Sequence, residues 1–293
     1  MMELFDPAKP FFKGNLHCHS TLSDGLLTPE EVKAAYREMG YDSLAITGHR
    51  VMGEETHMEG CLLVLSGIEA DFSLPGEVLH LIGVGMDGAF AREKLLRNPQ
   101  ACIRQIRRHG GRAIVAHPAW SLNTLGTLMA LADGVTAAEI YNSVSACPWS
   151  PDRADSSYML DVALTHGARY RFVASDDSHS YNGEAGVSCT MVQADDLTQD
   201  ALFAALDEGR FYCSQGPRFE QITVKPGSVE VLCSPVCHVL FASNLVWTAG
   251  RCHSGTGLTM AQYKTNKDQG ERYVRVQLVD AQGRKAWSNP IWL

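Results

Sequence analysis

Two histidines separated by a single residue, His17 and His19, stand near the start of the chain in the segment Asn15-Leu16-His17-Cys18-His19. In an extended strand, side chains two residues apart point to the same side, so the two imidazoles would converge on one point. Neutral imidazole is a common metal ligand. A lone pair of this kind is usually exposed to solvent, so it predicts a metal site only in the company of further ligands.

Further histidine and acidic residues follow apolar segments of strand length. The segments are Ser43–Thr47, Cys61–Leu65, Ala113–Ala116 and Arg171–Ala174. The residues that follow them are His49, Glu69, His117, Asp177 and His179. In a closed barrel of parallel strands, the carboxyl ends of the strands share one rim, where active sites are built. We therefore expect these side chains to lie close together.

Two other residues, His80 and Asp24, are added to the candidate metal ligands only because the other candidates are present. His80 lies in the hydrophobic segment Glu77–Gly83, where a histidine is ordinarily a hydrogen-bonded core residue. Asp24 precedes Gly25 in a sequence typical of a tight turn. Imidazole and carboxylate together suit metals such as zinc, iron and manganese, and a carboxylate such as Glu69 can bridge two ions. Because the set contains no cysteine, a purely structural zinc site is a weak explanation of it.

In these motifs the sequence resembles the PHP family, named for the polymerase and histidinol phosphatase proteins. The motifs are, in order, His17-Cys18-His19, Ser23-Asp24-Gly25, Ile46-Thr47-Gly48-His49, Gly67-Ile68-Glu69 with His80, and Ala116-His117-Pro118 followed by Asp177-Ser178-His179. The resemblance covers about residues 14–216 and implies a distorted seven-stranded β/α barrel. One position departs from it, because the family usually has Asp before the histidine that corresponds to His49, and this chain has Gly48.

The resemblance also implies three groups of metal ligands. The first is His17, His19, Glu69 and Asp177; the second shares Glu69 and adds His80 and His117; the third is Asp24, His49 and His179. Two or three divalent ions are therefore expected, drawn from zinc, manganese or iron, with magnesium as a further candidate. The aspartate that the family has at the position of Gly48 is not a direct ligand but can orient one. Its absence here therefore concerns the binding of the third ion.

The activity that the resemblance implies is hydrolysis of phosphoester bonds in a small phosphorylated metabolite or nucleotide. A hydroxide bridging the metals would attack phosphorus in line, while the metal charge would stabilise the phosphate oxygens. Asp177, His179 or a metal-bound water would supply the proton for the leaving group. Arg50, next to His49, is a candidate for binding the substrate phosphate through its planar fork of donors.

Two other functions stay open at this point. The same chemistry would serve to open an amide or a lactone, because a barrel scaffold does not determine which electrophile is attacked. Alternatively, the barrel is a non-catalytic, metal-stabilised binding module, an alternative that Gly48 favours. Against the second alternative stands the number of ionisable groups expected on one rim, since stability alone gives no reason to place them there.

The helices that would position these residues are predicted from sequence signals at their ends. Thr28-Pro29-Glu30-Glu31 predicts a helix that starts with a capping box, and Gly40 ends it. Further helices are predicted from Asn98 to Gly110, from Asp152 to Gly167 and from Thr198 to Gly209. Alternating with the apolar segments, Ala137–Ile140 among them, these helices predict a parallel α/β architecture.

The pattern changes after about Tyr212, where helix signals stop. Antiparallel strands are predicted at Gln221–Val224, Val236–Ala242 and Tyr273–Val279. The predicted fold is thus α/β, with a distorted (β/α)7, TIM-like barrel domain over residues 1–216 and a small β-rich, sandwich-like domain over residues 217–293. The length of 293 residues accommodates two such domains.

Composition limits the partners. A formal net charge of −8 disfavours long nucleic acids, which are neutralised by dense Lys and Arg surfaces, so a small phosphorylated substrate is expected. Carboxylates that hold metal are counted in this charge as free, so the pocket itself can still attract anions. The N-terminal residues lack the pattern of an export signal, and 9 cysteines without compact spacing suit reduced thiols. We expect a cytoplasmic protein without a membrane span; the sequence does not indicate its oligomeric state.

Overall fold

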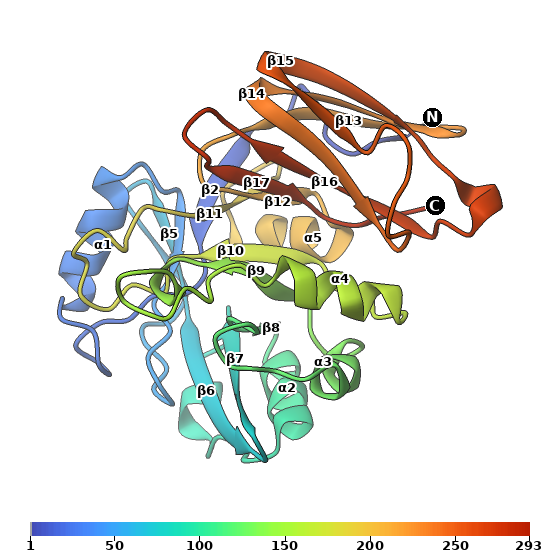
Figure 1. Ribbon diagram of the computed structural model, residues 1–293. Helices are drawn as coiled ribbons and strands as arrows, with labels where there is room; N and C mark the ends of the chain where they lie inside the picture. Colours follow the sequence, from blue (N-terminus) through green and yellow to red (C-terminus); the bar gives the residue numbers. More distant parts are fainter. Residues whose placement is uncertain (1) are drawn as a thin grey trace.

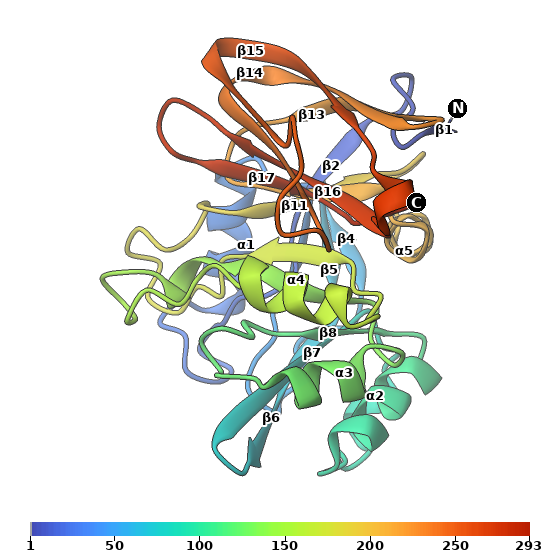
Figure 2. The ribbon, with the colours of Figure 1, turned by 45° about the vertical axis from the view of Figure 1, so that its right-hand side comes forward.

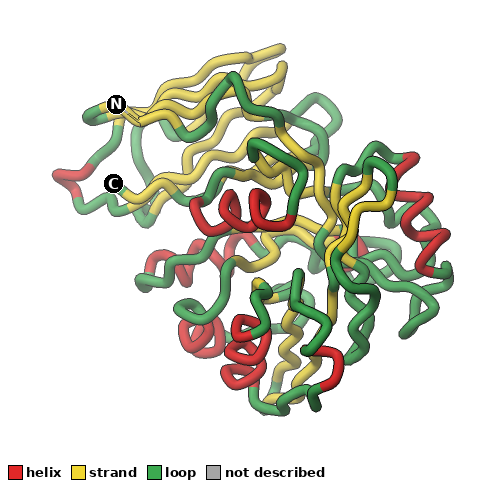
Figure 3. Tube along the Cα trace, turned by 180° about the vertical axis from the view of Figure 1, so that it is seen from behind, coloured by secondary structure: helices red, strands yellow, loops and turns green. Residues whose placement is uncertain are grey.

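The computed structural model describes residues 2–293 and has a mixed α/β fold with large sheets and few helices (Figure 1). The helices are α1 (Pro29–Glu38), α2 (Pro99–Arg108), α3 (Leu125–Leu131), α4 (Ser157–Thr165) and α5 (Gln199–Glu208), with 3-10 turns at Phe90–Arg92, Ser143–Ser145 and Lys267–Gln269. Seen from behind, the top of the molecule consists of strands and loops, and helices lie at the centre, at the lower left and along the right side (Figure 3). No helix in the described part of the chain is long and apolar enough to cross a membrane.

A smaller sheet contains the strands of the middle of the chain. Its strands are β6 (Gly67–Leu74), β7 (Glu77–Val84), β8 (Arg112–Val115), β9 (Ala137–Asn142) and β10 (Phe172–Ser175), in the order β10-β9-β8-β7-β6. Strands β8, β9 and β10 are parallel, as the predicted alternation requires. Strands β6 and β7 form an antiparallel hairpin around Gly76, whose φ of 78° only glycine adopts freely, and β7 is antiparallel to β8. The strand–helix alternation therefore holds only in part.

A larger sheet joins both ends of the chain. Its strands are β1 (Met2–Glu3), β2 (Phe11–Asn15), β3 (Ser43–Ala45), β4 (His57–Glu59), β5 (Leu62–Leu65), β11 (Cys189–Gln193), β12 (Phe211–Ser214), β13 (Phe219–Lys225), β14 (Ser228–Ser243), β15 (Cys252–Lys264), β16 (Tyr273–Val279), β17 (Lys285–Ser288) and β18 (Ile291–Trp292). The order is β1-β13-β14-β16-β17-β12-β11-β2-β3-β5-β4, with β15 beside β14 and β18 beside β16.

Two isolated bridges connect the sheets where the predicted ligands lie. Cys18, beyond β2, pairs with Ser178, beyond β10, and His49, beyond β3, pairs with Glu69 in β6. At the second junction the backbones approach closely, because a Cβ added to Gly67 would lie 2.5 Å from the carbonyl oxygen of Ile46. A glycine at this position therefore brings β6 against the end of β3.

The predicted helix signals are mostly confirmed. The capping box of α1 is present, with Thr28 accepting from the backbone N–H of Glu31 and Glu31 accepting from that of Thr28. Helix α4 begins at Ser157, later than predicted, because Asp155 pairs with Tyr141 beside β9 and caps Ser157 instead of entering the helix. Helix α3, capped by Thr124, was not predicted.

The predicted antiparallel strands after Tyr212 are confirmed as parts of β13, β14 and β16. Alternating residues of these strands, such as Val231, Val239 and Leu278, form a core of their own. In Figure 2, strands β13, β14 and β16 lie above the strands and helices of the preceding part of the chain. Because β12 pairs with β17, the large sheet continues from that part into the upper layer. A bidentate ion pair adds a second connection, because Arg275 Nε and Nη2 lie 2.7 and 2.6 Å from the Asp161 carboxylate of α4.

Candidate metal centre

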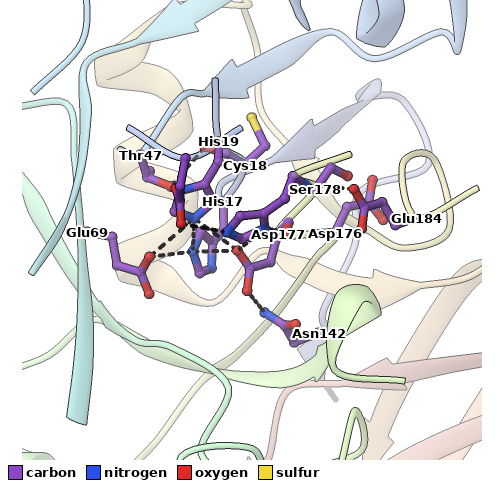
Figure 4. Close-up of polar contacts among 12 residues, drawn as sticks. His17, Cys18, His19, Thr47, Glu69, Asn142, Asp176, Asp177, Ser178 and Glu184 are labelled. Atoms are coloured by element: carbon purple, nitrogen blue, oxygen red, sulfur yellow. Dashed lines mark hydrogen bonds and ion pairs between the residues drawn. The ribbon is translucent and has the colours of Figure 1, made fainter. Parts of the chain in front are cut away.

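The predicted ligands converge at the ends of β2, β3, β8 and β10 and on the neighbouring β6 and β7. One cavity of about 300 Å³ is lined by Asp24, His49, Glu69, His80, His117, Asp177 and His179. His17 and His19 lie directly behind them and are completely buried. Figure 4 shows His17, His19, Glu69 and Asp177 directed toward one another. The structure thus brings together residues that are far apart in the sequence.

The innermost group consists of His17, His19, Glu69 and Asp177. The Nε2 atoms of the two histidines are 3.3 Å apart, and Asp177 Oδ1 lies 3.1 and 3.0 Å from them. Glu69 Oε2 is 3.3 and 3.2 Å from the same two nitrogens. Four ligands placed tetrahedrally at ordinary metal distances would be roughly 3.3–3.6 Å from one another. The four atoms therefore have nearly the spacing that one small divalent ion requires.

Asp177 Oδ1 is a buried oxygen that lies close to two imidazole nitrogens but accepts no well-directed hydrogen bond among residues 2–293. Such buried acceptors are rare in folded proteins, because poorly directed contacts compensate only part of the lost hydration. A cation between the four donor atoms would satisfy this oxygen. The residues present therefore fit a metal ion.

Glu69 has the geometry of a bridging carboxylate. While Oε2 faces the innermost group, Oε1 lies 2.6 Å from His80 Nδ1 and 3.3 Å from His117 Nε2. Oε2 is also 3.3 Å from His49 Nδ1. The side chain is 1% exposed, so this carboxylate contacts imidazoles on two sides and little solvent.

The outermost group contains Asp24, His49 and His179, with His19 beside them. Asp24 Oδ2 lies 3.5 Å from His49 Nε2 and 3.4 Å from His179 Nε2. At Gly48 an added Cβ would lie 3.2 Å from Ser23 Oγ, and this hydroxyl donates to Asp24 Oδ1 at 2.9 Å. Ser23 thus occupies the space beside Gly48 and orients Asp24.

The electrostatics of the group are those of a cation site. The pKa of His17 lies well above its ordinary value, because the carboxylates of Asp177 and Glu69 outweigh the burial that opposes the charged form. The pKa of Asp24 is lowered, chiefly by its hydrogen bond with His19. The buried carboxylates favour positive charge on His17, and a bound divalent ion would supply such charge.

A carboxylate behind the ligands, Glu139 of β9, was missed in the sequence. Its Oε1 accepts from His17 Nδ1 at 3.0 Å, and its Oε2 accepts from the backbone N–H of His117 and from Asn142 Nδ2, each at 2.8 Å. Asn142 Nδ2 also donates to Asp177 Oδ2 at 3.1 Å (Figure 4). The signal available in the sequence was an acidic residue within the apolar segment Ala137–Ile140. In the structure this side chain is completely buried.

Two further carboxylates hold the loops around the site. Asp176 accepts from the backbone N–H groups of Gly186 and Ser188. Glu184 accepts from the backbone N–H groups of His179 and Tyr181. These hydrogen bonds maintain strained backbone, since the φ of Asp177 is 55°.

Arg50, the predicted phosphate-binding residue, does not line the cavity. Its φ of 56° turns the chain, and its Nη1 donates to the carbonyl oxygen of Asp71 at 2.9 Å. Among the described residues, the cavity is lined by no lysine or arginine, and two tryptophans, Trp120 and Trp149, form part of its wall.

Comparison with known proteins gives short sequence matches. No protein-family model matches the chain. A 5'-3' exoribonuclease of Haemophilus influenzae is 29% identical over 100 residues, which are 32% of this chain and 36% of that protein. The 5'-3' exoribonuclease Rnm of Salmonella typhimurium is 35% identical over 100 residues, 32% of this chain and 34% of that protein. The chain therefore spans about a third of the length of the curated relatives it matches.

The structural match is longer. A two-domain protein from Bacteroides vulgatus, which contains a predicted PHP-like metal-dependent phosphoesterase, matches 99% of this chain and 96% of its own, with a TM-score of 0.54 and 17% identity. The chain has the PHP-like fold. The resemblance predicted from the histidine and aspartate motifs is thereby confirmed for the fold. In this chain the ends of the strands carry the clustered histidines and carboxylates described above.

Proposed function

We propose that this PHP-like protein is a metal-dependent hydrolase that cleaves phosphoester bonds of a small phosphorylated metabolite or nucleotide. The observation that carries the proposal is the convergence of His17, His19, Asp177 and Glu69, with donor atoms 3.0–3.3 Å apart around a carboxylate shared by two groups. The exoribonuclease relatives and the phosphoesterase-containing structural neighbour support a phosphoester over an amide or lactone.

The proposal includes two or three divalent ions, with zinc, manganese or iron suited to mixed imidazole and carboxylate ligands. His17, His19, Glu69 and Asp177 would hold the first ion, Glu69, His80 and His117 the second, and Asp24, His49 and His179 the third. Such ions lower the pKa of coordinated water and polarise phosphoryl oxygens. Glu69 and Asp177 would compensate the concentrated positive charge inside the protein.

The chain itself would orient ligands and move a proton. Glu139 holds the proton of His17 on Nδ1, so that Nε2 faces the cluster. His179 Nδ1 donates to the carbonyl oxygen of Asp177 at 2.8 Å, which directs its Nε2 toward Asp24. Of the two predicted proton donors, His179 is the more accessible, with 29% of its side chain exposed against 6% for Asp177. We assign proton transfer to the leaving group to His179 in a centre with two ions, in which its Nε2 binds no metal, and leave Asp177 as a ligand; with a third ion on Nε2, a metal-bound water would be the donor instead.

The finer architecture belongs to the same proposal. Strands β2–β11 would form the distorted barrel, with the Cys18–Ser178 and His49–Glu69 bridges as its two seams. The β-rich part after residue 216 would be a separate domain, and the cytoplasmic location stays a prediction from the cysteines. The charge of the chain disfavours long nucleic acids, whereas the relatives named as exoribonucleases introduce RNA as an alternative substrate.

The test is a metal count combined with an activity panel. Protein purified without chelator is analysed for bound metals and assayed with manganese or zinc for phosphate release from phosphomonoesters, cyclic nucleotides and a 5'-phosphorylated RNA. We expect two or three metals and turnover that a chelator abolishes and metal restores. Bound metal with amide or lactone hydrolysis but no phosphate release would overturn the phosphoesterase proposal, and no metal after reconstitution would overturn the site.

A further inference from the structure

Two tryptophans stand at the cavity of the candidate metal centre. Trp120 and Trp149 line the same cavity as the proposed ligands and are 38% and 41% exposed. Indole is a large apolar surface with a polar N–H, and its face is a stacking platform for flat rings. Exposed indoles beside a site built for phosphate chemistry therefore provide binding surface for the rest of a substrate.

Trp120 is held in a defined orientation by two proposed ligands. Its ring centroid lies 4.9 Å from that of His117 at an interplanar angle of 75°, and 5.7 Å from that of His80 at 58°. Because the imidazoles pack against one part of the indole, its remaining surface is available to the cavity without a change of position. A ring bound there would lie next to the second proposed ion.

Trp149 belongs to a different segment of the wall. It follows the 3-10 turn Ser143–Ser145, and its Cζ2 lies 3.8 Å from where a Cβ would stand on Gly183, beside the loop that carries His179. The neighbouring Ser150 also lines the cavity, and its buried hydroxyl has no hydrogen-bond partner among the described residues. This wall thus combines an aromatic ring with an unpaired polar group.

The charge of the cavity limits which charged groups a substrate can carry in addition to a ring stacked on the tryptophans. Among residues 2–293 neither lysine nor arginine lines it, and Arg50 is engaged by Asp71. The cavity wall contains the carboxylates of Asp24, Glu69 and Asp177, which the proposed ions would have to neutralise. A second phosphate or a long phosphate backbone would find no cationic side chain in this wall.

We propose that Trp120 and Trp149 form a stacking subsite, so that the substrate is a phosphoester with one phosphate and an uncharged aromatic or heteroaromatic ring next to it. The phosphate in this assignment rests on the proposed function, whereas binding of the ring can be measured without turnover. Stacking of one base on an aromatic side chain changes affinity by about 5- to 150-fold. The subsite would therefore select for a planar group at a magnitude that binding assays resolve.

The first measurement compares two phosphonates that cannot be hydrolysed as esters, phenylphosphonate and methylphosphonate, by calorimetry on the metal-loaded full chain. We expect wild type to bind the phenyl compound at least about tenfold more tightly. Trp149→Leu should remove much of this preference without changing methylphosphonate affinity, and Trp149→Phe should retain it. Trp247→Leu, in an exposed loop after β14, is the matched control and should behave as wild type. Equal binding of the two phosphonates by wild type overturns the subsite.

The second measurement uses phosphate release from phenyl phosphate, glycerol 2-phosphate and a nucleoside 3',5'-bisphosphate. Trp149→Leu should raise KM for phenyl phosphate and leave KM for glycerol 2-phosphate within about twofold. A preference for the bisphosphate over phenyl phosphate would overturn the single-phosphate assignment. Selective phenylphosphonate binding without release from any ester would refute the proposed function and leave the subsite intact, and turnover without ring selectivity would do the reverse.

Discussion

The substitution Glu139→Gln tests whether a buried carboxylate sets the tautomer of a proposed metal ligand. Glu139 accepts three hydrogen bonds, from His17 Nδ1 on one oxygen and from His117 N–H and Asn142 Nδ2 on the other. Glutamine has the same shape but replaces one oxygen by an NH₂ group, which can only donate. The amide would keep its oxygen toward the two donors and present its NH₂ to His17 Nδ1.

The consequence falls on the other nitrogen of His17. With Nδ1 forced to accept, the proton moves to Nε2, the atom that lies 3.1 Å from Asp177 Oδ1 and 3.3 Å from Glu69 Oε2. A protonated Nε2 has no lone pair for a metal. Metal binding at Nε2 would force the proton back to Nδ1, facing the amide NH₂, so the hydrogen bond would be lost. Such a loss at a charged group costs about 1.5–3 kcal/mol, which corresponds to about 10- to 150-fold in metal affinity.

The assay is competition for zinc or manganese with a chromogenic chelator at fixed pH, followed by phosphate release at saturating metal. Near-ultraviolet circular dichroism checks that the variant is folded, and Glu220→Gln, an exposed change on β13, is the matched control. We expect weaker metal binding in Glu139→Gln alone. Metal affinity and turnover within about twofold of wild type, in a folded protein, would refute the reasoning about His17.

Other substitutions test the site and the fold. Glu69→Gln should lower the number of bound metals by at least one and reduce turnover at least about 100-fold, as measured by elemental analysis and phosphate release, because it replaces a bridging ligand. Arg50→Ala should change KM by less than about twofold, since its guanidinium is turned away from the cavity; a large rise in KM would contradict this. Gly67→Ala should cost about 1–3 kcal/mol in urea unfolding, because its Cβ would meet backbone. Asp161→Asn should destabilise the protein by about 3 kcal/mol by leaving Arg275 buried without its partner, and thermal unfolding of the double variant Asp161→Asn/Arg275→Met should recover most of the loss.

The convergence of these side chains was predictable because their positions directly after apolar segments indicated a shared edge. Residues after apolar segments meet at one edge whenever the strands are parallel, which holds for His49 after β3 and for Asp177 after β10. His17 and His19 lie beyond β2, so their convergence depends on the Cys18–Ser178 bridge rather than on strand alternation alone. Tertiary pairing, not local periodicity, completes the site.

The sequence did not predict features that depend on the orientation of a strand or on the partners of a side chain. Periodicity identifies a strand but not its orientation, so the antiparallel β6–β7 hairpin was not expected, although Pro75-Gly76 is a turn sequence. Arg50 was predicted at the loop beside the cavity, but its guanidinium donates to the Asp71 carbonyl oxygen and the residue does not line the cavity. Glu139 was overlooked because a single acidic residue within an apolar strand has no partner visible in the sequence.

The pairing of β1 with β13 has a consequence for how the protein is made. Met2 lies opposite Val224, so the N-terminal strand has no partner until about 220 further residues have been synthesised. At ribosomal rates of about 5–20 residues per second, this delay is roughly 10–45 s. During that interval Met2 and Glu3 stay without their β13 partners. Completion of the large sheet is therefore a late event of biosynthesis, and slowing translation between β12 and β13 should prolong this interval.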